Sequence, residues 1–99
     1  MIFNEALEKI INHYGMSKQL YKATEELAEL IQALCKWAVT DAETNTDKLI
    51  NLEENIIEEM ADVQIMLEQL KIFFAVNPQG FEEKMKYKID RTLKRIKEE

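Results

Sequence analysis

The 99-residue sequence has a single cysteine, Cys35, and only three residues that break helices: Gly15, Pro78 and Gly80. One cysteine excludes an internal disulfide framework and a thiolate-rich zinc site, and it is typical of a reducing compartment. No stretch of strand length alternates apolar and polar residues. We therefore expect an all-α protein with few interruptions.

Excess positive charge and long apolar runs are also missing. Thirteen Lys and Arg stand against nineteen Asp and Glu, a net charge of −6, which disfavours binding to duplex nucleic acid. No apolar run reaches the roughly 18 to 20 residues of a membrane span, and residues 1–15 lack the basic segment and cleavage site of a signal peptide. We expect a soluble, cytoplasmic protein that does not bind membranes.

What the sequence has is strong patterning. Hydrophobic residues make up 46% and charged residues 32%, a composition that folds, and the length suits one core. We therefore expect a single domain over residues 1–99, built from four helices. Their expected ranges are 2–14, about 18–40, about 48–76 and 81 to about 97, with Ser17 as a cap, a polar loop at 41–47 and a turn at 77–80.

Apolar residues at helical spacing mark the expected core. On the second helix the stripe comprises Leu20, Leu27, Leu30, Ile31, Leu34 and Ala38; on the third it comprises Leu49, Leu52, Ile56, Met60, Val63, Leu67, Leu70 and Phe74. Ile65 and Ile72 fall on the opposite side of the third helix. They are either two exposed isoleucines or a second contact surface, and we interpret them as part of a homo-oligomer, a homodimer or homotetramer.

Two acidic segments resemble each other: Glu25-Glu26-Leu27-Ala28-Glu29-Leu30 and, 33 residues later, Glu58-Glu59-Met60-Ala61-Asp62-Val63. If the loop reverses the chain, residues at one height of the hairpin have numbers with a constant sum. Glu29 with Glu59, and Glu26 with Asp62, both sum to 88, and the midpoint, residue 44, lies in the expected loop. The hairpin therefore predicts one quartet of carboxylates.

The quartet predicts a cation site, because four neighbouring acids repel one another unless a cation neutralises them or their pKa values rise. Oxygen ligands favour Mg²⁺, or Mn²⁺ as a substitute. A di-iron site would need histidines beside the acids, and the single histidine, His13, lies in the first helix. The plainer alternative for an acidic pair is a solvated helix face.

The acidic pattern Glu25-Glu26-x-x-Glu29 followed by Glu59-x-x-Asp62 resembles the MazG-like, all-α nucleoside triphosphate pyrophosphohydrolase superfamily. His13-Tyr14-Gly15 with Gln19 is similar to its short phage-type members. The resemblance implies a four-helix bundle whose second and third helices form an antiparallel hairpin. It also implies Mg²⁺-dependent hydrolysis of a nucleoside triphosphate to a monophosphate and pyrophosphate, with Glu26, Glu29, Glu59 and Asp62 as metal ligands.

Other residues have two interpretations each. Glu25 and Glu58 are candidates for holding a second metal or the attacking water, or they are surface glutamates. Lys88 and Arg91, in a segment that resembles the family's basic C-terminal helix, either contact phosphate or cover a surface. Lys36 is a further phosphate candidate, and Trp37 either stacks on the base or packs in a core or an interface.

A different class of function is also compatible with the sequence. The chain could be a non-enzymatic, acidic helical module whose carboxylates bind a partner or mediate oligomerisation. This alternative predicts no dependence on a metal, whereas the hydrolase predicts that Mg²⁺ or Mn²⁺ stabilises the fold.

Overall fold

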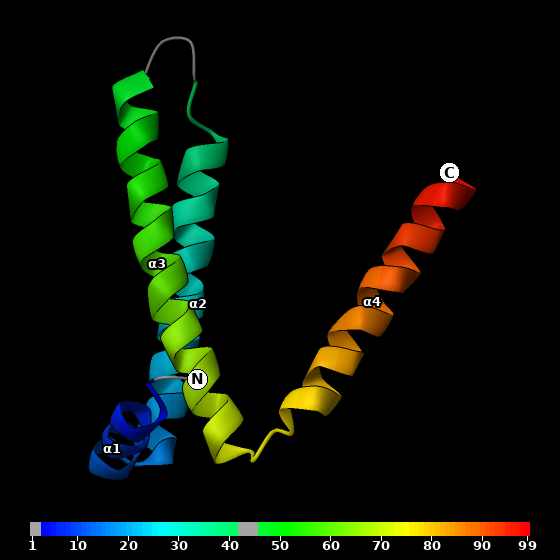
Figure 1. Cartoon of the computed structure of the whole chain (residues 1–99). Coiled ribbons are helices and arrows are strands. Elements are labelled where there is room, and N and C mark those ends of the chain that lie inside the picture. Colours follow the sequence, from blue (N-terminus) through cyan, green and yellow to red (C-terminus); the bar gives the residue numbers. More distant parts are fainter. Residues whose placement is uncertain (1–2, 42–45) are drawn as a thin grey trace.

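A computed structural model describes residues 3–41 and 46–99. Within these ranges the secondary structure is helical and contains no strand, so the expected all-α class is confirmed (Figure 1). The four helices are α1 (Asn4–Tyr14), α2 (Met16–Ala38), α3 (Thr46–Phe73) and α4 (Pro78–Glu98). None of these helices is both long and apolar enough to cross a membrane.

Helix ends differ from the expected ones where local chemistry allows the helix to extend. Ser17 was predicted to cap the second helix, but it lies inside α2. The residue that directly precedes α2 is Gly15, at φ 84°. Pro78 is the first residue of α4 and not part of a turn, because a first-turn residue needs no N–H for the helix. The side chain of Asn77 caps α4 by accepting a 2.9 Å hydrogen bond from the N–H of Gly80. Residues 42–45 of the expected loop lie outside the described residues.

Helices α2 and α3 form the expected antiparallel hairpin and pack more closely than any other pair. The side-chain amide of Gln19 donates a 2.9 Å hydrogen bond to the side-chain carbonyl of Gln69. Their numbers sum to 88, which is the register expected from the acidic segments. Helix α1 crosses the end of the hairpin that lies away from the loop, where Leu7 is buried (Figure 1).

The core stripe expected on α2 was wrong. Helix α2 directs Gln19, Ala23, Glu26 and Ala33 toward α3, and all four are buried. The small alanines let the two helices approach closely, and the larger apolar residues then lie one position further along, about 100° around the helix. On α3, Val63 is buried as expected, whereas Met60, Leu67 and Phe74 of the expected stripe are exposed.

Six exposed apolar residues of the two helices lie on one side of the hairpin. Each one directly follows a residue directed toward the partner helix, so it lies about 100° further around its own helix. In an antiparallel pair, this rotation brings the side chains of both helices to the same side. We call this surface the apolar face; it comprises Leu20, Leu27, Ile31, Leu34, Met60 and Leu67, which are 40–62% exposed.

Helix α4 leaves the hairpin at a sharp angle (Figure 1). The ammonium group of Lys71 lies 4.6 Å from the centre of the Phe81 ring, which holds the first turn of α4 against the end of α3. Beyond that junction, α4 packs against none of the helices α1 to α3 as described. The radius of gyration is 17.3 Å, against roughly 13 Å for a compact domain of this length. Within one chain, the described helices that pack together are α1, α2 and α3, and not the four of the expected bundle.

Candidate metal centre

Three carboxylates meet between α2 and α3, halfway along the hairpin. One carboxylate oxygen from each of Glu26, Glu29 and Glu59 lies within 4.8 Å of the other two. The first two are three residues apart on α2 and so project from one side of that helix. The register of the hairpin places the third opposite them. Three members of the predicted quartet are thus brought together.

The cluster includes two carboxylate oxygens that are buried without a hydrogen-bond partner. Glu26 is only 6% exposed, Glu59 is half-buried, and Glu29 lies at the surface. Neither the Oε2 of Glu26 nor the Oε2 of Glu59 accepts a hydrogen bond from any described residue. A buried polar atom without a partner is costly, so these two atoms are suited to accept a cation or a hydrogen-bond donor.

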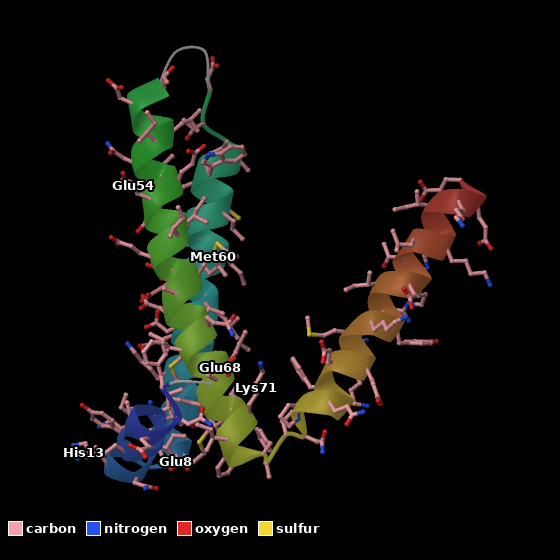
Figure 2. All side chains as sticks on the ribbon, viewed as in Figure 1. Glu8, His13, Glu54, Met60, Glu68 and Lys71 are labelled. Atoms are coloured by element: carbon pink, nitrogen blue, oxygen red, sulfur yellow. The ribbon has the colours of Figure 1, made fainter. Side chains whose placement is uncertain are left out.

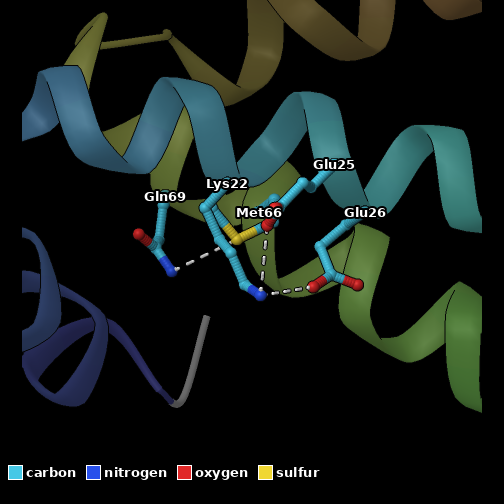
Figure 3. Close-up of polar contacts among 5 residues, drawn as sticks. All are labelled: Lys22, Glu25, Glu26, Met66 and Gln69. Carbon is cyan, nitrogen blue, oxygen red and sulfur yellow. Dashed lines mark hydrogen bonds and ion pairs between the residues drawn. The ribbon is translucent and has the colours of Figure 1, made fainter.

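Lys22 is the cation that the structure places at this cluster. Its ammonium group lies 3.0 Å from the Oε1 of Glu26 and 3.5 Å from a carboxylate oxygen of Glu25 (Figure 3). The hydrogen bond with Glu26 and the negative charges of Glu26 and Glu25 raise the pKa of Lys22. Lys22 therefore neutralises one edge of the cluster and leaves the second oxygen of Glu26 without a partner.

The electrostatics of the cluster are clearest at Glu29. The negative charge of Glu26 raises the pKa of Glu29, and desolvation and the charge of Glu59 act in the same direction. The charges of Glu26 and Glu59 therefore oppose the ionisation of Glu29, which is a condition that a divalent cation relieves.

The other predicted acids lie near the cluster without joining it. Asp62 is exposed, and its carboxylate is not among the three that converge. Glu25 is exposed and pairs with Lys22, and Glu58 is exposed on α3. All three lie within one helical turn of a cluster residue.

The predicted substrate-binding residues are spread more widely. Lys36 is exposed in the last turn of α2. The indole N–H of Trp37 donates a 3.3 Å hydrogen bond to Glu53, so this ring bridges the hairpin about 12 Å along α2 from Glu29. Lys88 and Arg91 are exposed on α4, where the guanidinium lies 5.9 Å from the centre of the Tyr87 ring. Within one chain, α4 does not bring these two side chains to the cluster.

An open groove of about 860 Å³ adjoins the cluster. Its lining includes Tyr14, Lys18, Tyr21, Lys22 and Glu25, so it combines aromatic rings with two lysines next to the carboxylates. The ammonium group of Lys18 lies 5.4 Å from the centre of the Tyr14 ring. Aromatic and cationic side chains in one groove can bind a base and phosphates respectively.

Lys18 and Lys22 were missed by the sequence reasoning. Lys22 lies three residues before Glu25 and four before Glu26, which is the spacing of ion pairs on a helix. That spacing is the sequence signal that could have identified Lys22. His13 projects from α1 at the end of the hairpin opposite the loop, whereas Met60, next to Glu59, lies midway along α3 (Figure 2). The histidine is not among the groups that converge at the cluster.

No protein-family model, no curated protein and no solved structure matches this chain.

Proposed function

We propose that this protein is a Mg²⁺-dependent nucleoside triphosphate pyrophosphohydrolase of the MazG-like type. One observation carries the proposal: three carboxylates from two antiparallel helices converge, and two of their buried oxygens have no partner among the described residues. The type of reaction is inferred from the resemblance of the two acidic segments to the MazG-like superfamily.

The donor set fits the proposed cation. Carboxylate oxygens suit Mg²⁺ and Mn²⁺, and no described His or Cys side chain belongs to the cluster, which disfavours zinc. Glu26, Glu29 and Glu59 would hold the cation. Asp62, one turn from Glu59, would be the fourth ligand. When bound, such a cation would supply charge neutralisation for phosphate oxygens and activation of the attacking water.

In the proposed reaction, the oxygen of water attacks the α phosphorus of the triphosphate. The bond from that phosphorus to the α–β bridging oxygen breaks, and pyrophosphate leaves with the electron pair. Glu25 or Glu58 accepts the proton that the water loses. Lys18 and Lys22 contribute positive charge from the groove, and Lys88 and Arg91 stay proposed phosphate contacts.

We also propose that the functional unit is a homo-oligomer, a homodimer or a homotetramer. Ile65 is 43% exposed on α3. Ile72 is half-buried and lines a groove where α1, α3 and the start of α4 meet. The apolar face groups six exposed apolar residues on one side of the hairpin, so it is the larger candidate interface.

The proposed function is tested by turnover of a panel of nucleoside triphosphates with Mg²⁺, with Mn²⁺ and with a chelator. We expect metal-dependent turnover that falls at least about 100-fold in Glu26→Gln, Glu59→Gln and Asp62→Asn, because each change removes a proposed ligand. Glu54→Gln, which alters an exposed acid on α3 outside the cluster, is the matched control and should retain activity.

The same proteins distinguish the hydrolase from the non-enzymatic module. Mg²⁺ that binds only the folded state raises the melting temperature by mass action, by an amount equivalent to about 2.7 kcal/mol at 100 times the dissociation constant. We expect this shift in the wild type and in Glu54→Gln but not in Glu26→Gln. Absence of both turnover and a metal-induced shift would support the non-enzymatic module.

A further inference from the structure

Helix α4 carries an apolar stripe that nothing in the described chain covers. The stripe comprises Phe81, Met85, Ile89, Leu93 and Ile96, which recur at helical spacing and are 38–58% exposed. Phe81 contacts Lys71 of α3, and α4 as a whole packs against none of the helices α1 to α3 as described. A helix with this amphipathic pattern is stable when its apolar side is packed against a partner surface.

The apolar face of the hairpin matches this stripe in length. On α2 the face extends from Leu20 to Leu34, about 21 Å along the helix axis, and the stripe on α4 extends from Phe81 to Ile96, about 22 Å. Two exposed apolar surfaces of equal length in one small chain are unusual for a monomer.

The two surfaces also belong to segments of opposite charge. Helix α4 contains seven Lys and Arg and four Asp and Glu, a net charge of +3, whereas residues 1–77 contain six and fourteen, a net charge of −8. Charge complementarity therefore favours a hairpin that contacts α4 over a hairpin that contacts another hairpin.

The exposed area shows how much surface a partner can cover. The chain exposes 8186 Å², whereas a compact monomer of 11.7 kDa exposes roughly 5,900 Å². The excess is about 2,300 Å², and a stable interface buries about 800 Å² on each partner. The chain thus has enough spare surface for a large interface.

We propose that two copies of this chain exchange their α4 helices, so that the stripe of each copy docks on the apolar face of the other. The four-residue connection between α3 and α4, with Ala75 at φ 49°, directs α4 away from its own hairpin, and a two-fold arrangement covers both surfaces in both copies. The exchange rests on the proposed homo-oligomer, but it is independent of the proposed hydrolysis. It places the basic residues of α4 beside the acidic hairpin of the other copy.

The experiment measures the solution mass of full-length variants by light scattering, with helicity followed by circular dichroism. Ile89→Glu disrupts the stripe and Ile31→Glu disrupts the apolar face. Tyr87→Glu, on the opposite side of α4, and Val39→Glu, beyond the end of α2, introduce the same charge at residues that are at least as exposed. We expect a dimeric or larger wild type, monomeric Ile89→Glu and Ile31→Glu, and unchanged mass in both controls.

Mixing the two disrupted variants tests the exchange itself. The intact α4 of Ile31→Glu can dock on the intact face of Ile89→Glu, so an equimolar mixture should regain dimers that neither variant forms alone. This recovery also shows that both variants are folded.

Three results would overturn the exchange. An unchanged mass in Ile89→Glu would remove α4 from the interface. If Ile31→Glu is monomeric while Ile89→Glu keeps the wild-type mass, the two hairpins pack face to face. A monomeric wild type would overturn the exchange together with the proposed oligomer, whereas the hydrolase is tested separately by metal-dependent turnover.

Discussion

The ammonium group of Lys22 lies 3.0 Å from the carboxylate of Glu26, the most buried acid of the candidate metal centre. The pair joins two residues one turn apart on α2, and it satisfies one of the two carboxylate oxygens. The proposed divalent cation would compete with Lys22 for Glu26, and its binding would then be thermodynamically coupled to the lysine.

Replacing this lysine should therefore strengthen metal binding. Lys22→Met keeps much of the apolar stem and removes the charge that competes for Glu26, so we expect Mg²⁺ to bind roughly three- to tenfold more tightly, allowing for the solvent exposure of the pair. Without metal, the variant should melt at a lower temperature than the wild type, since Glu26 then loses its cation. Isothermal titration calorimetry and thermal melting measure the two effects.

Lys18→Met is the matched control for this prediction, because Lys18 lies over the Tyr14 ring and outside the carboxylate cluster. It should leave Mg²⁺ affinity close to that of the wild type. Weaker metal binding in Lys22→Met would show that the lysine supports the site instead of competing for it.

The raised pKa of Glu29 makes a prediction about pH. A carboxyl group whose pKa is higher in the folded state favours folding below its unfolded pKa, and this contribution is lost as the pH rises through the folded pKa. Glu29→Gln has no charge to repel Glu26 and Glu59. In a chelator, we therefore expect it to melt at a higher temperature than the wild type at pH 7 to 8, and the difference should shrink toward pH 4.

Excess Mg²⁺ should reverse that order, since the wild type gains a bound cation and the variant lacks a ligand. Glu54→Gln again serves as the control, and its melting temperature should follow that of the wild type in both conditions. If Glu29→Gln is no more stable than the wild type at neutral pH without metal, the carboxylates do not repel one another as described.

The buried amide pair predicts a strong coupling between the two helices. Gln69 is 2% exposed and accepts the hydrogen bond that Gln19 donates. Gln69→Leu leaves that donor buried without its acceptor, at a cost of about 2 kcal/mol in the free energy of unfolding. The double variant with Gln19→Leu should lose less than the two single changes together. Additive losses in urea denaturation would indicate that the amides are not coupled.

The sequence predicted the helices and the register well, because both depend on local signals. Gly15 and the polar loop separate the helices, and the repeated acidic segments set the register that Gln19 and Gln69 confirm. The side of α2 that faces α3 could not be predicted this way. Helical periodicity shows that Leu27 and Ile31 share one side of α2. It does not show that α3 can approach more closely on a different side, where Ala23 and Ala33 lie.

The candidate site was predicted in part for the same reason. Spacing places Glu26, Glu29 and Glu59 on adjacent surfaces, and the structure brings their carboxylates together. The Asp62 carboxylate is not among them, and spacing does not determine the side-chain rotamer that sets where a carboxylate lies. The direction of α4 depends on the backbone at residues 74–77, so no pattern within α4 could show that Lys88 and Arg91 leave their own hairpin.

The central claim is hydrolysis between the α and β phosphates, and the most direct test is to locate the oxygen that water contributes. The wild type is incubated with Mg²⁺ and a deoxynucleoside triphosphate that it turns over, in water enriched in heavy oxygen, and the products are analysed by mass spectrometry. We expect one heavy oxygen in the nucleoside monophosphate and none in an equal amount of pyrophosphate. Heavy oxygen in inorganic phosphate, with a nucleoside diphosphate as the other product, would contradict the proposed reaction.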